Sequence, residues 1–194
     1  MHLESEYPDF ANLMDKWGYA WEAFKVHTED RYIISTFHIL GKKGEQPSNG
    51  FQSGSRGTVL CQHGDFQDGT IWMSYFLFGA PFHLKLVDAG YDVWIGNNRG
   101  TKYSREHETL SAVDDNDYWM YTWADMGLYD DVANISMIRQ RAGVDKMFYV
   151  GYSQGTIQMF YGLAHLESQF HAETLHKVVQ LAPCFYASLG ETVE

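Results

Sequence analysis

The stretch MFYVGYSQGTIQMFYGLAHL, residues 147–166, sets the pattern for the whole chain. Its first part is a short apolar run that predicts a buried strand over Lys146–Val150, and its last part predicts a helix over Thr156–Leu166. Between them stands Gly151-Tyr152-Ser153-Gln154-Gly155, a G-x-S-x-G sequence. Strand, sharp turn and helix in this order are the setting in which a nucleophilic serine is presented above a sheet.

The two glycines around Ser153 have a steric reason. A nucleophile elbow strains the backbone and brings it close to its neighbours, so Gly151 and Gly155 remove Cβ atoms that would collide. The helix that follows directs the positive end of its dipole at the place where an oxyanion develops. Chance alone produces such a match in roughly one chain of this length in fifteen, so a purely structural glycine turn is the alternative.

The rest of the chain predicts an α/β fold with a mostly parallel sheet, helices on both faces and an N-terminal antiparallel hairpin. A glycine-rich loop separates the hairpin from alternating strands and helices. The sequence thus divides into a lead-in segment over 1–57 and a partial α/β core over 58–194. Besides the elbow strand and helix, the expected strands are Trp21–Thr28, Tyr32–Leu40, Thr58–Gln62, Tyr91–Ile95 and Lys177–Leu181, the expected helices Pro81–Ala89 and Asp125–Arg141, and the loop Gly41–Gly57.

Composition excludes several classes of protein. The 45% hydrophobic and 16% aromatic residues describe a packed globule and not a disordered chain. The formal charge of −11 and the absence of clustered Lys and Arg argue against nucleic acid as a partner. No run approaches the ~18 apolar residues of a membrane helix. The first residues contain acidic side chains and no apolar signal core, so the sequence as written predicts a cytosolic protein.

The cysteines and the candidate metal ligands of the sequence do not indicate a functional site. Cys61 and Cys184 lie in apolar runs and are expected to be two buried free thiols. The acidic run 114–117 lacks the Gly and Glu of a calcium loop. The histidines of the C-terminal part do not follow a zinc-ligand spacing. These patterns therefore predict no metal site.

A second element fits the chemistry of the elbow. His63-Gly64-Asp65 directly follows the strand Thr58–Gln62. In serine hydrolases with this elbow, one oxyanion donor is a backbone N–H of the loop after an early strand, and the other belongs to the residue after the nucleophile. The backbone N–H groups of Asp65 and Gln154 are therefore the predicted oxyanion hole, and losing one such donor costs ~10²–10³ in rate. The alternative is that Gly64 is an ordinary strand-end turn.

Longer motifs resemble the acid lipases, the gastric and lysosomal acid lipase group. They occur in the family's order and span nearly the whole chain: Trp17-Gly18-Tyr19, Val26 to Tyr32, Gly90-Tyr91-Asp92-Val93-Trp94-Ile95-Gly96-Asn97-Asn98-Arg99-Gly100, Tyr103 to His107, Tyr118-Trp119, Trp123-Ala124-Asp125-Met126, Tyr129-Asp130, Tyr149 to Thr156 and Leu181-Ala182-Pro183.

The resemblance implies an α/β-hydrolase fold that cleaves fatty acyl esters of triacylglycerols or sterols at a lipid–water interface. Ser153 would attack the ester carbonyl and form an acyl-enzyme that water then cleaves. The resemblance also implies that neither a metal nor an organic cofactor is needed. Asp65 departs from the family, which usually has an apolar residue after its His-Gly. Its carboxylate would oppose a developing negative charge. Family members are usually secreted or lysosomal, which the first residues of this sequence do not indicate.

The base and the orienting acid of a triad are not assigned. In this fold they follow the serine in the order acid, then histidine, and only His165, His171 and His176 come later. The family's own acid and histidine come from loops after strands beyond Lys177–Leu181. The sequence thus predicts an N-terminal half of the fold that ends after about the sixth strand, exposes an apolar edge and has little or no esterase activity.

Two alternatives stay open beside the lipase-like reading. One is a carboxylesterase for small esters, and the other is a non-catalytic vestigial hydrolase or binding protein that keeps the elbow without a triad. The oligomeric state is left open as well.

Overall fold

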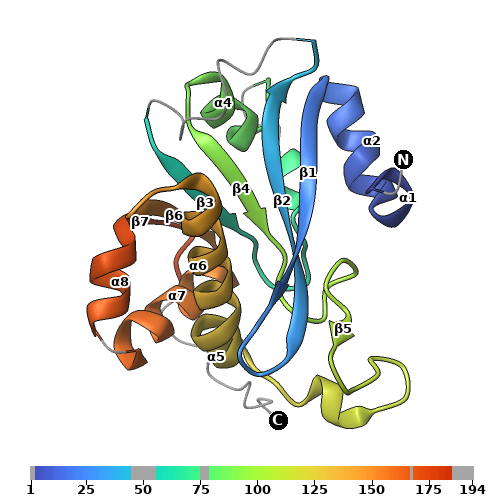
Figure 1. Ribbon diagram of the computed structural model, residues 1–194, viewed down its shortest axis with the longest axis vertical. Helices are drawn as coiled ribbons and strands as arrows, with labels where there is room; N and C mark the ends of the chain where they lie inside the picture. The colour runs from blue at the N-terminus through green and yellow to red at the C-terminus, as the bar shows by residue number, and fades with distance from the viewer. Residues whose placement is uncertain (1–2, 45–55, 75–78, 167, 185–194) are drawn as a thin grey trace, which may run out of the picture.

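The computed structural model describes residues 3–44, 56–74, 79–166 and 168–184, and Figure 1 shows their arrangement around one twisted sheet. The strands are β1 (Tyr19–His27), β2 (Tyr32–Lys42), β3 (Thr58–Gln62), β4 (Asp92–Gly96), β5 (Glu106–His107), β6 (Met147–Tyr152) and β7 (Leu175–Leu181). The helices are α1 (Leu3–Glu6), α2 (Pro8–Trp17), α3 (Ile71–Ser74), α4 (Phe82–Asp88), α5 (Trp123–Asp125), α6 (Asp131–Ala142), α7 (Gln154–His165) and α8 (Ser168–Thr174), with a 3₁₀ turn η1 (Asn116–Trp119) and a π-helical segment η2 (Met126–Asp130).

The described strands form a single mixed sheet in the order β1-β2-β4-β3-β6-β7, with the two-residue β5 paired to β2. β3, β4, β6 and β7 run parallel, which is the pairing expected for the apolar strands of the core. β1 and β2 form the predicted antiparallel hairpin, and β2 joins the core antiparallel to β4. The expected α/β architecture with an antiparallel lead-in is therefore confirmed.

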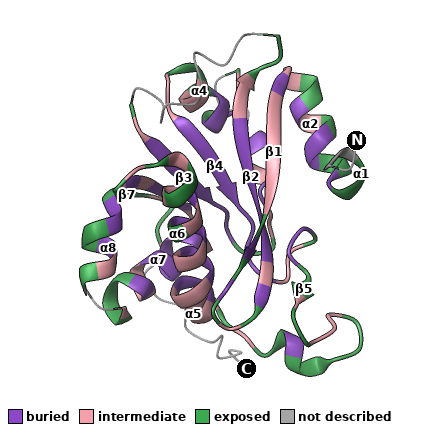
Figure 2. Cartoon of the chain, in the orientation of Figure 1, coloured by how far each residue is buried: buried purple, intermediate pink, exposed green. Residues whose placement is uncertain are grey.

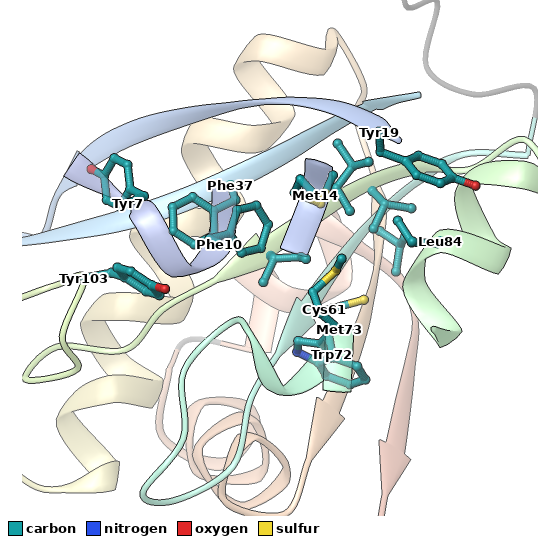
Figure 3. Packing of buried hydrophobic residues seen from close by; sticks show 14 of the residues in the cluster. Tyr7, Phe10, Met14, Tyr19, Phe37, Cys61, Trp72, Met73, Leu84 and Tyr103 are labelled. Carbon is teal, nitrogen blue, oxygen red and sulfur yellow. The ribbon is translucent and has the colours of Figure 1, made fainter. Parts of the chain in front are cut away.

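Helices cover both faces of the sheet because successive strand residues point to opposite sides. Val59 and Cys61 of β3 face a core that contains Phe10 of α2 and Leu84 of α4, and Figure 3 shows side chains of this cluster. Leu60, between them, faces the other core, with Ile135 and Ile138 of α6 and Met159 of α7 among its members. Figure 2 shows that β3 and β4 are buried along their length.

The helices α1, α2, α3 and α8 are absent from the sequence expectations. Helix α2 has Pro8 at its start and ends at Gly18, whose φ of 75° is the left-handed cap that glycine adopts at no steric cost. Helix α8 is a short segment between α7 and β7. His171 lies in α8, between α7 and β7, whereas His176 lies within β7.

The helix expected over Asp125–Arg141 is divided. Thr122 and Asp125 form a capping box that starts the short α5. A π-helical turn, η2, then inserts one extra residue before α6 continues to a left-handed Gly143. The π turn lies where this helix packs most closely on α7, because a Cβ on Gly127 would meet the backbone oxygen of Gln158 at 2.2 Å.

β7 forms one edge of the described sheet. Among the described strands it pairs only with β6. Val179 is 45% exposed and Leu181 36% exposed, which is high for apolar strand residues of an α/β fold. The exposed apolar edge predicted for Lys177–Leu181 is therefore present in the described part of the sheet.

Candidate active site

Ser153 occupies a strained turn between β6 and α7. Its φ of 50° and ψ of −114° lie outside the regions that residues with a Cβ ordinarily adopt. The turn is fixed on both sides, since its amide donates to the carbonyl oxygen of Leu181 at 3.0 Å and its carbonyl oxygen accepts from the amide of Thr156 at 2.8 Å. Such strain persists only where the surrounding structure holds it, and it is typical of functional sites.

The two motif glycines are required by contact with backbone. A Cβ on Gly151 would lie 2.6 Å from the carbonyl oxygen of Gly155. A Cβ on Gly155 would lie 2.7 Å from the carbonyl oxygen of Gln62 and 2.9 Å from that of His63. The close approach predicted from the G-x-S-x-G spacing is thus confirmed, and it joins the elbow directly to the end of β3.

The loop after β3 lies against Ser153. A Cβ on Gly64 would stand 2.9 Å from the Cβ of Ser153. Asp65 follows, and its carboxylate accepts a 2.9 Å hydrogen bond from the backbone N–H of Phe66. Ser153, Gln154 and Asp65 line one cleft of about 420 Å³. The structure therefore brings together the three residues selected from the sequence.

The remaining cleft walls are mainly apolar and aromatic. They are formed by Tyr121, Thr122, Trp123, Met126, Ile157 and Cys184. Met126 enters the cleft from the π-helical segment, and its sulfur is 3.0 Å from Nε2 of Gln154. Sequence periodicity does not reveal this wall, because one inserted residue in a helix leaves no strong pattern. The signal that could have pointed to it is Gly127, a glycine inside an otherwise helical run.

His63 is buried and supports the loop after β3. Its Nδ1 is 2.7 Å from the carbonyl oxygen of Gly64, and its Nε2 accepts from the backbone N–H of Asn98 at 3.0 Å. Burial lowers the pKa of His63 from its ordinary value. The ring is therefore neutral with its proton on Nδ1, so that His63 fixes the backbone beside Ser153.

The three histidines that follow Ser153 are not among the residues that line its cleft. His165 stacks on Tyr161 at the far end of α7, and its Nδ1 is 3.0 Å from that residue's carbonyl oxygen. His171 is buried in α8, where burial lowers its pKa. The ring of His176 packs beside Phe148, 5.6 Å between centroids. None of these placements identifies a base for Ser153.

The cysteines differ from each other. Cys61 is a buried free thiol whose pKa burial raises to about 12. Cys184 is also free but only half-buried, and it lines the cleft. The expectation that it is buried is therefore wrong. The backbone N–H of Cys184 donates to Thr156 Oγ1 at 2.9 Å, which holds the residue beside the start of α7.

No group of three or more His, Cys, Asp or Glu side chains in the described ranges is placed to hold a metal ion. No described helix is both long and apolar enough to cross a bilayer.

Comparison with known proteins places this geometry in a family. A family model described as a partial alpha/beta-hydrolase lipase region matches residues 10–75, and one described as alpha/beta hydrolase fold matches residues 57–185. Mouse lipase member M is 40% identical over 79% of this chain and 35% of its own length. Mouse gastric triacylglycerol lipase is 34% identical over 90% of this chain and 47% of its own length.

Human lysosomal acid lipase/cholesteryl ester hydrolase is 37% identical over 75% of this chain and 35% of its own length. The chain thus spans about a third to a half of the length of these curated relatives. Two of the three carry the names of a gastric and a lysosomal lipase, so the expectation of a cytosolic protein finds no support in those names.

Solved structures agree on the fold. Carboxylesterase CesB from Bacillus subtilis superimposes with a TM-score of 0.56 at 14% identity, over 92% of this chain and 49% of that one. The esterase Pf2001 from Pyrococcus furiosus gives a TM-score of 0.56 at 17% identity, over 89% and 52%. With the family models and the acid lipase relatives, these likenesses show that the chain belongs to the α/β-hydrolase family.

Proposed function

We propose that this chain carries the nucleophile and the oxyanion hole of a serine ester hydrolase that acts on neutral lipid esters. The observation that carries the proposal is the position of Ser153, held at positive φ against Gly64 in the cleft that Gln154 and Asp65 also line. A serine in this conformation exposes Oγ between the two backbone segments from which oxyanion donors come.

The chemistry that this arrangement supports is acyl transfer. Ser153 Oγ attacks the ester carbonyl carbon, and the carbonyl electron pair moves to oxygen, where the N–H groups of Gln154 and Asp65 stabilise the negative charge. The C–O bond to the alcohol then breaks and leaves an acyl-serine, which water cleaves to the free acid. In a complete triad a histidine takes the serine proton and gives it to the departing alcohol, a role assigned to no described residue of this chain.

Neutral lipid esters are the proposed substrate class. The relatives named above include a triacylglycerol lipase and a cholesteryl ester hydrolase. The cleft walls of Tyr121, Trp123, Met126 and Ile157 suit an acyl chain. Phe66, beside Asp65, is fully exposed and could contact a lipid–water interface next to the cleft.

The carboxylate of Asp65 is compatible with this role. It bonds to the amide of Phe66, so the side chain is occupied beside its own backbone. The donor to the oxyanion is the N–H group, which does not depend on the side chain. Its negative charge still weakens the hole, so replacing it by a neutral residue should raise the acylation rate.

Slow turnover is expected of the chain itself. None of the three histidines after Ser153 lines the cleft, and an oxyanion hole and substrate binding without a full triad leave only about 10³–10⁴-fold catalysis over water. This placement also favours the second candidate, a vestigial hydrolase that binds esters without cleaving them.

The test is single-turnover acylation with p-nitrophenyl butyrate and p-nitrophenyl laurate, using Ser153→Ala as the matched control. The proposal expects one equivalent of nitrophenol per chain, released faster from the laurate and absent in the control. Faster release from the butyrate would favour a carboxylesterase for small esters. Equal release by wild type and control would support the vestigial hydrolase.

A further inference from the structure

A cluster of buried polar side chains lies beneath the elbow and takes no part in the chemistry proposed above. It consists of residues from four elements and one loop, none more than 1% exposed: Gln62, Asn98, Asp131, Tyr149 and Gln158. Burying polar groups is costly unless they bond to one another. A chain that retains such a group in its core uses it to fix one arrangement of the elements around it.

One arm of the cluster reaches the elbow. The hydroxyl of Tyr149 donates to the carbonyl oxygen of Gly155 at 2.8 Å, and its oxygen is 3.3 Å from Oδ2 of Asp131. Gly155 has no room to move towards the end of β3, because a Cβ added to it would lie 2.7 Å from the carbonyl oxygen of Gln62. Asp131 and Tyr149 therefore fix the distance between the Gly155 backbone and the end of β3.

The other arm reaches the loop after β3. Nε2 of Gln158 donates to Oδ1 of Asp131 at 2.8 Å, and Nδ2 of Asn98 donates to Oε1 of Gln158 at 2.9 Å. The backbone N–H of Asn98 bonds to His63, which in turn bonds to the carbonyl oxygen of Gly64 at 2.7 Å. This arm thus ends at the residue that contacts Ser153.

Asp131 is the point at which the two arms meet, and it has no cation of its own. Arg99 pairs with the adjacent Asp130 and with Asp30. Burial raises the pKa of Asp131 well above its ordinary value, and the charge of Asp130 raises it further, against the hydrogen bonds from Gln158 and Tyr149. The single hydroxyl proton of Tyr149 is thus shared between the carbonyl oxygen of Gly155 and the carboxyl group of Asp131.

We propose that Asp131 is a positioning residue, which holds the Gly155 and Gly64 segments at a fixed separation on the two sides of Ser153. Tyr149 transmits this constraint to Gly155, and Gln158 with Asn98 transmits it to Gly64. The inference rests on the proposed function in one respect only, namely that these two segments supply the oxyanion donors.

The test compares variants by hydrogen exchange of the backbone, resolved by mass spectrometry for peptides that contain residues 62–66 and 152–156. Asp131→Leu removes every hydrogen bond of the side chain at similar volume. Asp131→Asn keeps both, because its Nδ2 can donate to Tyr149 while its oxygen accepts from Gln158. Tyr149→Phe breaks only the arm to Gly155.

The matched control is Asn134→Leu. Asn134 lies one turn along the same helix, is equally buried and bonds to Thr36 outside the cluster. It reports what a destabilised α6 does by itself.

We expect Asp131→Leu to raise exchange about tenfold in both peptides, Tyr149→Phe to raise it in 152–156 alone, and Asp131→Asn to leave it unchanged. The proposal is overturned if Asp131→Leu changes the two peptides no more than Asn134→Leu does. If Asp131→Leu does not fold, the proposal is overturned when Tyr149→Phe changes exchange of the 152–156 peptide no more than Asn134→Leu does. Exchange does not require ester cleavage, so a failure of the proposed function is seen separately as absent acylation of the wild type.

Discussion

The Cβ of Ser153 stands 2.9 Å from where a Cβ on Gly64 would lie, so the elbow and the loop after β3 are in contact without an intervening side chain. Gly155 likewise packs without an intervening side chain, against the carbonyl oxygens at the end of β3. The nucleophile is therefore held by backbone packed against backbone. Such a site tolerates little change of volume.

Gly155→Ala should destabilise the fold by about 3 kcal/mol or more, because both atoms that its Cβ meets are backbone oxygens that cannot turn away. Urea denaturation measures the loss. The control is Gly143→Ala, where nothing lies within 4 Å and the φ of 65° alone costs about 1 kcal/mol. A loss at position 155 no larger than at position 143 would show that the elbow is not closely packed.

Ser153→Gly should stabilise the chain by about 1 kcal/mol. The serine is held at φ 50° and ψ −114°, and strain of this kind costs roughly 1–3 kcal/mol, which glycine relieves at some cost in chain entropy. Ser153→Ala keeps the Cβ and the strain, so it should gain nothing. Thermal unfolding of the three proteins compares them. If the alanine variant gained as much as the glycine variant, the strain would not be in the backbone.

Arg99→Met should cost roughly 3–5 kcal/mol, because it leaves the fully buried Asp130 without its charge partner. Arg99 bonds to Asp130 through Nε at 2.8 Å and lies over the ring of Tyr32. The exposed pair of Lys102 and Asp9 gives the comparison, since Lys102→Met should cost less than about 1 kcal/mol. Chemical denaturation measures the free energy of unfolding of both variants. Similar losses for Arg99→Met and Lys102→Met would contradict the importance of the buried pair of Arg99 and Asp130.

Acid should weaken the fold partly through His83. Burial lowers its pKa to about 3, whereas an unfolded histidine has a pKa near 6.5. The unfolded state therefore binds a proton first, and the contribution of His83 to stability is complete above pH 6.5 and is lost as the pH falls towards 3.

Between pH 7.5 and pH 4.5 this loss is about 2–3 kcal/mol, and His83→Leu should remove it. Buried His63 and His171 also have lowered pKa values, so part of the acid sensitivity remains. Free energies of unfolding at the two pH values measure the difference. Parallel losses in wild type and variant would contradict the role of His83.

The parts of the fold that could be predicted are those specified locally. The strand, the glycines and the helix around Ser153 lie within 20 residues, and their spacing alone predicts the close approach that the structure shows. Helix α2 could have been found as well, because Pro8 and Gly18 mark its ends.

Other features depend on partners far away in sequence. The π turn before α6 arises where Gly127 meets Gln158, and His63 acquires its role from Asn98, 35 residues later. Cys184 reaches the cleft because its amide bonds to Thr156. Neither periodicity nor composition contains these contacts, so sequence reasoning selected Ser153, Gln154 and Asp65 but not the buried cluster below them.

The central claim is that Ser153 is an activated nucleophile beside an oxyanion hole. Incubation of the folded chain with a fluorophosphonate probe, followed by mass spectrometry of the peptide that contains residue 153, tests it most directly. We expect a phosphonyl adduct on Ser153, formed more slowly than on a serine hydrolase with a complete triad and absent from Ser153→Ala. A folded wild-type chain that forms no adduct at this residue would contradict it.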